Sequence, residues 1–135
     1  MQPQARVSDD RTLEGLRLLV VEDDAILLMD LEQILQSAGA EIVLCRSVAD
    51  ALAALAENRI AAAVLDFRIG QETIVPVARQ LSQRGTPFIF YTGQLPGDLS
   101  LAEWRRCAVV IKPAPARKIV AAVVEALNTK SAAAI

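Results

Sequence analysis

Short, mainly apolar runs alternate along this chain with stretches in which apolar residues recur every three or four positions. The runs cover residues 16–21, 40–44, 61–65, 87–92 and 108–111. Continuous short runs are typical of strands buried on both faces, whereas the wider spacing is typical of helices with one apolar face. The pattern predicts an α/β fold, a doubly wound five-stranded parallel sheet with strand order 2-1-3-4-5 and right-handed crossovers.

Glycine, proline and hydroxyl residues mark the predicted helix ends. Gly39 and Gly85 follow the first and third helical stretches, where glycine commonly ends a helix. Residues 47–50 read Ser-Val-Ala-Asp, a capping box in which Ser47 and Asp50 satisfy each other's backbone donors. Pro76 is tolerable only near the first turn of the third helix.

The chain of 135 residues has the size of one ordinary domain. Residues 1–15 show no periodicity and are expected to form a flexible leader, residues 16–128 the domain, and residues 129–135 a flexible tail. The fourth helix is reduced, because only residues 100–106 are available for it. Leu101 and Trp104 are three apart and can share one face of that helix.

Composition narrows the possible functions. With 53% apolar residues but only 4% aromatic ones, the core must be aliphatic. A net charge of −2 argues against a nucleic acid or an anionic membrane surface as a partner attracted by bulk charge. No apolar stretch approaches the ~18 residues of a membrane span, and the polar start does not resemble a signal peptide.

Histidine is absent, which excludes histidine acid/base catalysis and histidine-ligated zinc in this chain. Cys45 and Cys107 stand alone in apolar settings, without the spacing of a metal site or a redox pair. We interpret both as free thiols in a reducing cytosol and expect a cytoplasmic protein.

Polar residues end four of the predicted strands: Glu22 and Asp23, Asp66, Thr92, and Lys112. Carboxyl ends of parallel strands meet at one edge of the sheet, where ligands bind in this class of fold. Carboxylates ~4 Å apart repel by roughly 4 kcal/mol at an effective dielectric of 20, so such a cluster needs cations. Lys112 supplies one, and the all-oxygen donor set suits Mg²⁺ together with a phosphoryl group.

Each residue also has an ordinary explanation when taken singly. The acids at 22–24 favour a helix start, Thr92 is a common strand residue, and Lys112 could be a solvated charge. All four features in this order are much harder to explain that way.

The segments Leu-Val-Val-Glu-Asp-Asp at 19–24, Val-Leu-Asp at 64–66 followed by Gly70, Tyr-Thr-Gly at 91–93, and Lys-Pro at 112–113 carry a specific resemblance. Together they resemble the receiver domain of bacterial two-component response regulators, over about residues 16–128. The resemblance implies the flavodoxin-like (βα)5 fold and, for a chain of this length, a stand-alone single-domain regulator.

The resemblance assigns the phosphoacceptor and the metal ligands. Asp66 would take a phosphoryl group from a phosphohistidine, forming an aspartyl phosphate. Asp23 would bind Mg²⁺ directly and Glu22 largely through water, with Asp66 and the backbone carbonyl of Arg68 completing the protein's share. Asp24 falls just after the acidic pair, and we interpret it as a helix cap.

The resemblance also assigns the groups around the phosphoryl. Lys112 would pair with its oxygens, and the Thr92 hydroxyl would donate a hydrogen bond to one of them and then shift the following loop. Gly93 would leave space beside the phosphoryl group, and Pro113 would follow a cis peptide bond.

The implied partners are a histidine kinase or histidine phosphotransfer protein upstream and a target protein downstream, with a homodimer possible. The implied activity is that of a phosphoacceptor that promotes only its own phosphorylation and dephosphorylation, rather than that of an enzyme. Three departures, the reduced fourth helix among them, weaken the family's usual output mechanism. Val109 stands where many receivers have an aromatic residue, and Ala114 stands where the family often has phenylalanine.

Three alternatives remain open at this stage. A pseudo-receiver would bind its partner regardless of phosphorylation. A phosphohydrolase with an aspartyl-phosphate intermediate would want a second acid where Arg68 stands. A nucleotide binder would want Ser, Thr or Gly where the acids 22–24 stand, and no G-x-G-x-x-G fingerprint is present.

Overall fold

The computed structural model describes residues 12–93, 104 and 107–134, with side chains described as far as residue 129. A five-stranded sheet lies at its centre, with strand order β2-β1-β3-β6-β7 and every neighbouring pair parallel. The strands are β1 (Arg17–Val21), β2 (Glu41–Cys45), β3 (Ala62–Leu65), β6 (Phe88–Thr92) and β7 (Ala108–Ile111). Numbered among the sheet strands alone, this is the predicted order 2-1-3-4-5.

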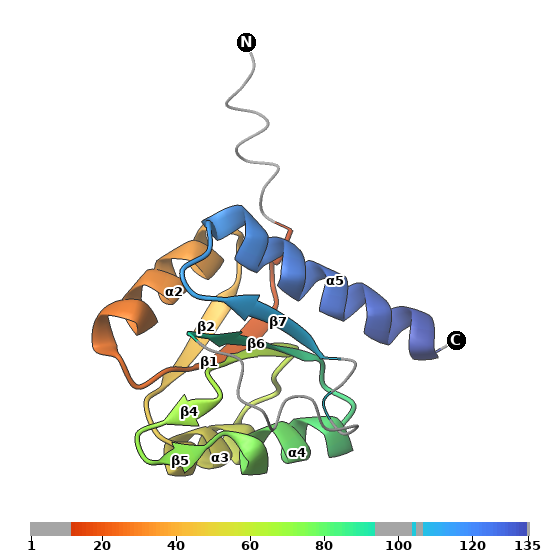
Figure 1. The fold of residues 1–135 in the computed structure, drawn as a ribbon. Helices are drawn as coiled ribbons and strands as arrows, with labels where there is room; N and C mark the ends of the chain where they lie inside the picture. Colours follow the sequence, from red (N-terminus) through yellow and green to blue (C-terminus); the bar gives the residue numbers. More distant parts are fainter. Residues whose placement is uncertain (1–11, 94–103, 105–106, 135) are drawn as a thin grey trace.

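Helices cover both faces of the sheet. They are α2 (Ala25–Ser37), α3 (Val48–Glu57), α4 (Val75–Gln83) and α5 (Ala116–Ala134). Figure 1 shows α2 and α5 on one face and α3 and α4 on the other. No helix within the described ranges is long and apolar enough to cross a bilayer.

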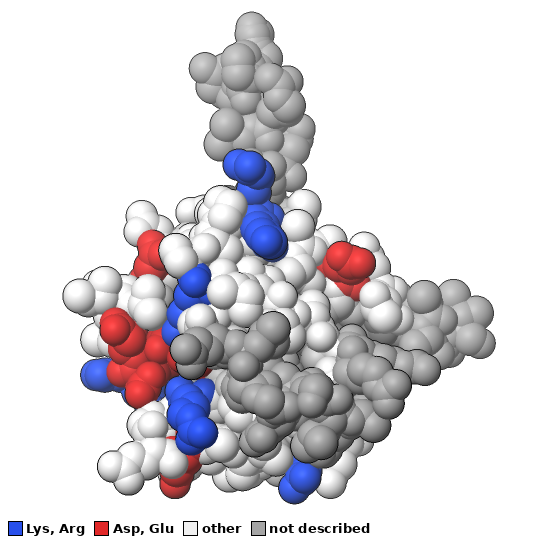
Figure 2. Space-filling model, in the orientation of Figure 1, with Lys and Arg blue, Asp and Glu red and all other residues white. Residues whose placement is uncertain are grey.

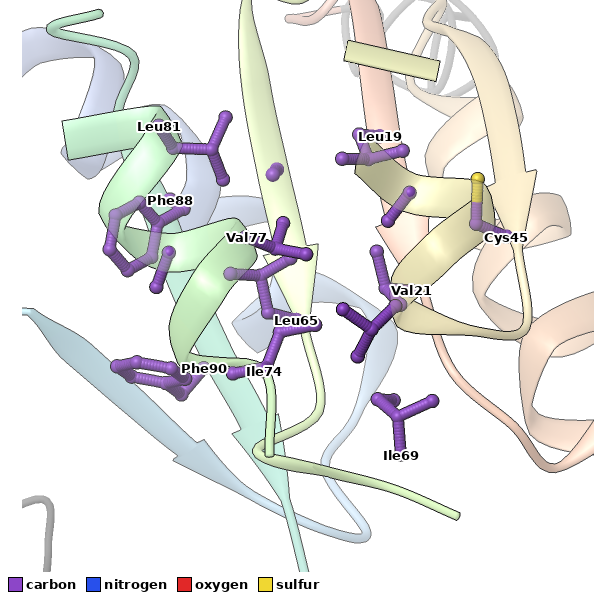
Figure 3. Close-up of a cluster of buried hydrophobic side chains, with 14 of the residues drawn as sticks. Leu19, Val21, Cys45, Leu65, Ile69, Ile74, Val77, Leu81, Phe88 and Phe90 are labelled. Atoms are coloured by element: carbon purple, nitrogen blue, oxygen red, sulfur yellow. The ribbon is translucent and has the colours of Figure 1, made fainter. Parts of the chain in front are cut away.

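Alternate side chains of the central strands feed two separate apolar clusters. On β1, Leu19 and Val21 belong to the cluster beneath α3 and α4, while Leu18 and Val20 belong to the one beneath α2 and α5. Figure 3 shows the first cluster, where Phe90 of β6 also lies. Because each strand is covered twice, its sequence is apolar without alternation, as predicted.

Local signals place the helix ends. The Ser47 hydroxyl accepts a hydrogen bond from the Asp50 backbone N–H (3.0 Å), which is one half of the predicted capping box. Pro76 lies in the first turn of α4. After α2, Gly39 has φ +101°, a conformation that favours glycine, and a Cβ there would lie 2.8 Å from the Glu14 Cα.

The contact between Glu14 and Gly39 shows that part of the expected flexible leader, residues 1–15, is packed on the domain. Residues 12–15 form a turn packed on the domain, and Leu13 is fully buried in the cluster beneath α2 and α5. The Leu13 N–H donates to the Ala38 carbonyl (2.9 Å). The ordered chain therefore begins at least three residues before residue 16, because a single leucine can fill a gap beside α2 without any periodic pattern.

The other end also differs from the expectation. Helix α5 continues to Ala134, so most of the predicted flexible tail at 129–135 is helical. The segment contains no proline or glycine, and residues 132–134 are alanine, the best helix former. The predicted fourth helix at 100–106 lies outside the described residues except for Trp104, which is buried against Phe88 and Phe90.

A small hairpin follows β3 and was not predicted. Strand β4 (Arg68–Ile69) pairs antiparallel with β5 (Glu72–Thr73) through a two-residue turn. Gly70 occupies the first turn position with φ +62°, as the tight primed hairpin turns require. Ile69 is buried in the cluster beneath α3 and α4, which anchors the hairpin beside the carboxyl edge of the sheet.

Candidate functional site

Three carboxylates meet where β1 and β3 end. Glu22 and Asp23 follow β1, and Asp66 follows β3. One oxygen from each lies within 4.8 Å of the others, and this is the only group of metal-ligating residues of its kind in the part of the chain that the structure describes. Glu22 is only 1% exposed, so at least one of these acids is withheld from water.

Lys112 provides the counter-charge. Its Nζ lies 2.6 Å from Glu22 Oε1 and 2.8 Å from Asp66 Oδ2, with the Asp66 side chain 12% exposed. The Lys112 backbone N–H donates to the Thr92 carbonyl (2.9 Å), because β7 pairs with β6 up to this point. In Figure 2, acidic side chains gather beside basic ones at one edge of the molecule, where the loop after β1 lies in Figure 1.

Burial and pairing shift the pKa values of both partners. Burial raises the pKa of Glu22 above its ordinary value, although hydrogen bonds from Lys112 and from the Asp24 N–H act in the opposite direction. Burial works to lower the pKa of Lys112, but hydrogen bonds to Asp66 and Glu22 outweigh it and raise that pKa overall. Lys112 therefore remains a cation at neutral pH.

The acidic loop is held by its own hydrogen bonds. Asp24 is the N-cap of α2, as predicted: its Oδ1 accepts from the backbone N–H groups of Ile26 (2.9 Å) and Leu27 (3.1 Å). The Asp24 N–H donates to Glu22 Oε2 (3.1 Å). One oxygen of Glu22 thus fixes the loop while the other pairs with Lys112.

Asp23 is held from two sides, by Gly70, which the motif contained but to which no role was assigned, and by Arg46, which the sequence did not single out. Its Oδ2 accepts from the Gly70 N–H at the hairpin turn (2.9 Å). Its backbone carbonyl accepts from Arg46 Nη2 (2.9 Å) and Nε (3.3 Å). Arg46 directly follows β2, at the same edge as the acids, and that position was the available signal in the sequence.

The remaining predicted residues lie along the same edge. Thr92 ends β6 and is buried, and a Cβ at exposed Gly93 would meet no atom of the described residues within 4 Å. The Lys112–Pro113 peptide bond is cis, as the resemblance implied. Arg68 begins β4 with an exposed side chain.

Two of the departures from the family pattern, Val109 and Ala114, are partly buried. Val109 is partly buried beneath α3 and α4, and Ala114 beneath α2 and α5. The Ala114 N–H donates to the Tyr91 hydroxyl (3.4 Å), while Lys112 Nζ lies 5.7 Å from the centre of the Tyr91 ring.

Cys45 and Cys107 are free thiols, and burial raises the pKa of each.

Chemically, the edge offers carboxylate oxygens, one ammonium group and a strand-terminal hydroxyl. Hard cations such as Mg²⁺ take such oxygen ligands and retain waters for an anionic ligand. The donor set therefore fits Mg²⁺, because an ion there would relieve the mutual repulsion of the three carboxylates.

The comparison with protein families decides which family the chain belongs to. The family model described as the response regulator receiver domain matches residues 18–124. The chain belongs to the response regulator receiver domain family. Receiver domains of this family are signalling phosphoacceptors that bind Mg²⁺ at an acidic cluster and interact with histidine kinases or phosphotransfer proteins.

Individual relatives agree with this assignment. The receiver is 37% identical over 73 residues to the sensor protein TorS of Escherichia coli, a match covering 53% of this chain and 8% of TorS. The chain thus spans less than a tenth of that relative's length.

Solved structures give the same result. A response regulator receiver protein from Sinorhizobium medicae superposes with TM-score 0.76 and 27% identity, covering 87% of this chain and 98% of that one. The response regulator PhyR from Brucella abortus gives TM-score 0.76 and 26% identity, covering 96% of this receiver and 55% of PhyR.

Proposed function

We propose that this receiver accepts a phosphoryl group on Asp66 from a partner histidine kinase or histidine phosphotransfer protein, in a Mg²⁺-dependent reaction. It then signals by phosphorylation-dependent protein binding or by phosphorelay. The observation that supports this best is the position of Asp66, beside two further carboxylates and in contact with Lys112 (2.8 Å).

The transfer needs one nucleophile and one leaving group. A carboxylate oxygen of Asp66 forms a bond to phosphorus while the bond between phosphorus and the donor's imidazole nitrogen breaks. The imidazole leaves with the electron pair and takes up a proton from solvent, so this chain needs no histidine of its own. Apart from promoting its own phosphorylation and dephosphorylation, the receiver needs no enzymatic activity.

The metal would be held by Asp23, Asp66 and the Arg68 carbonyl, with Glu22 acting mainly through water. A bound Mg²⁺ supplies positive charge that offsets the charge of the phosphoryl oxygens. Lys112 already contacts Asp66, and it stays close to the oxygens that the aspartyl phosphate adds there.

Thr92 would transmit the change. Phosphorylation adds close to two negative charges and further acceptor oxygens beside Asp66. The Thr92 hydroxyl would donate to one of them, and the open space beside Gly93 leaves room for the phosphoryl group. The loop that follows would then present a different surface to a partner.

Protein partners are supported by apolar surface next to the site. Ile26 and Met29, near the start of α2, are 79% and 66% exposed. An exposed apolar patch beside a phosphoacceptor suits a kinase, a phosphotransfer protein or a downstream target. We place this exchange in the cytoplasm, in line with the free thiols Cys45 and Cys107, and a homodimer is compatible with it.

The test is the intact mass of the purified protein after incubation with Mg²⁺ and acetyl phosphate or phosphoramidate. We expect the wild type to gain one phosphoryl group, and the gain to disappear with a chelator. Asp66→Asn removes the nucleophile at nearly constant shape and should gain none. Asp30→Asn, an exposed carboxylate on α2, is the matched control and should label like the wild type.

The other outcomes point elsewhere. A folded wild type that stays unlabelled beside a labelled reference receiver would favour the pseudo-receiver, which binds its partner regardless of phosphorylation. Sustained release of phosphate from a phosphomonoester, lost in Asp66→Asn, would favour a phosphohydrolase. The presence of Arg68 two residues after Asp66 opposes that activity.

A further inference from the structure

Arg46 contacts the metal-binding loop without contributing a ligand to it. The residue directly follows β2, which lies beside β1 in the sheet, and its side chain is exposed. Two of its guanidinium nitrogens converge on one acceptor, the Asp23 backbone carbonyl, at 2.9 and 3.3 Å. A two-donor contact of this kind restricts the orientation of the peptide plane that it binds.

The Asp23 carboxylate is held by a different element, the β4–β5 hairpin. Asp23 Oδ2 accepts from the Gly70 N–H at the tip of the β4–β5 hairpin. That oxygen is therefore engaged by the hairpin, and one carboxylate oxygen of Asp23 lies within 4.8 Å of an oxygen of Glu22 and of Asp66. Arg46 and the hairpin together set both the backbone and the side chain of Asp23.

We propose that Arg46 is a positioning residue for the metal site, which holds the Asp23 carbonyl so that the Asp23 carboxylate is presented to Mg²⁺ in one orientation. This inference rests on the proposed function, because it assumes that Asp23 is a metal ligand. Residues that orient metal ligands from outside typically change metal affinity about 10- to 100-fold when they are mutated.

If Arg46 acted only through its charge, its removal would change Mg²⁺ affinity in the opposite direction. The guanidinium adds positive charge near a site that binds a cation, so removing it would strengthen Mg²⁺ binding if Arg46 acted only through charge. If Arg46 acts by orientation, removing it weakens binding. The direction of the change therefore separates the two roles.

The experiment is calorimetric titration of Mg²⁺, or of Mn²⁺ followed by paramagnetic resonance, into the full chain without any phosphodonor. Arg46→Met removes the charge and both donors at similar length, and we expect about 10-fold weaker binding. Arg46→Lys keeps the charge but replaces the two-donor contact with a point charge, and we expect an intermediate affinity. Arg17→Met is the matched control, because Arg17 pairs with Glu41 at the other end of the same two strands.

Two further measurements distinguish a role in orientation from a role through charge. Raising the salt concentration should leave the ratio of wild-type to Arg46→Met affinity largely unchanged, since screening acts on charge. In phosphorylation assays, Arg46→Met should raise the Mg²⁺ concentration needed for half-maximal rate, while saturating Mg²⁺ restores most of the maximal rate. If Arg46→Met does not fold, Arg46→Lys carries the comparison.

An affinity for Arg46→Met equal to or tighter than that of the wild type would overturn the positioning role while leaving the proposed function intact. Wild-type protein that binds neither ion would overturn both, and the two failures are distinguishable in one set of titrations.

Discussion

The middle of the sheet and its carboxyl edge contrast in what they bury. In the middle, Phe90 is fully buried, with the rings of Phe67, Phe88 and Trp104 centred 5.5 to 6.0 Å away. At the edge, Glu22 is 1% exposed, yet it is a carboxylate whose pKa is raised by burial.

The two regions therefore make opposite contributions to folding. Burying an aromatic or aliphatic side chain stabilises the fold by about 1.5–3 kcal/mol. Burying a carboxylate costs free energy unless its partners compensate for the lost water. In the described ranges, the only charged or hydroxyl-bearing polar side chains that are buried, tyrosine aside, are those of Glu22 and Thr92. Glu22 directly follows β1 and Thr92 ends β6, both at this edge. A fold does not need such residues there, so their placement points to ligand chemistry.

The largest expected effect comes from breaking the middle of the sheet. Phe90→Ala should destabilise the protein by about 3–5 kcal/mol, because it leaves a cavity among three rings. Phe90→Leu should cost less than ~1.5 kcal/mol, since most of the volume is kept. Urea unfolding measures both, and Ile111→Ala, at a 42% exposed position on β7, should change stability by less than 1 kcal/mol.

The same variants test whether the regions are separable. Folded Phe90→Leu should bind Mg²⁺ with wild-type affinity, because the Phe90 ring packs against other aromatic rings and not against the carboxylates of the edge. A large loss of affinity in that variant would mean that the core and the edge are coupled.

A second change removes the counter-charge at the edge. Lys112→Met leaves Glu22 and Asp66 facing each other without a cation, and we expect a loss of about 2–3 kcal/mol at pH 7.5 without divalent ions. Mg²⁺ should stabilise this variant more than the wild type, because it replaces the missing positive charge. Lys118→Met, which alters an exposed lysine on α5, is the control and should stay within ~0.5 kcal/mol of the wild type.

The deficit of Lys112→Met should depend on pH. A carboxyl whose pKa is raised in the folded state favours folding below its unfolded pKa, and that contribution is lost as the pH rises through the folded pKa. Loss of Lys112 raises the pKa of Glu22 further, so the deficit should be smallest near pH 4 and grow towards neutral pH. Urea unfolding at several pH values measures it, and a deficit that shrinks as the pH rises would contradict this account.

The sequence predicted the sheet and the meeting of the acids because both follow from strong regularities. Double covering makes β3 and β6 continuously apolar, and parallel strands bring Glu22, Asp66 and Lys112 to one edge whatever the loops do. Neither inference required knowledge of a single side-chain contact.

The features that were missed depend on individual contacts. Leu13 fills a gap that exists only once α2 is in place, and the β4–β5 hairpin rests on Gly70 and on the burial of Ile69. The position of Arg46 directly after a strand puts it at the carboxyl edge, but only the fold shows its contact with the Asp23 carbonyl. Such contacts have no periodicity that a sequence pattern can reveal.

The smallest expected effect compares two helix N-caps, one inside the acidic loop and one outside it. Asp24 caps α2 inside the acidic loop, whereas Ser47 caps α3 with one hydrogen bond. Asp24→Ala and Ser47→Ala should each cost about 1 kcal/mol in urea unfolding, the usual loss for a cap.

Their effects on Mg²⁺ binding should separate a cap from a ligand. Because the Asp24 side chain is engaged by the backbone N–H groups of Ile26 and Leu27, we expect both variants to bind Mg²⁺ within about two-fold of the wild type. Loss of affinity in Asp24→Ala alone, at equal destabilisation, would make Asp24 part of the metal site. The acidic loop would then bind metal through three consecutive carboxylates, and the cap would be the secondary role of this residue.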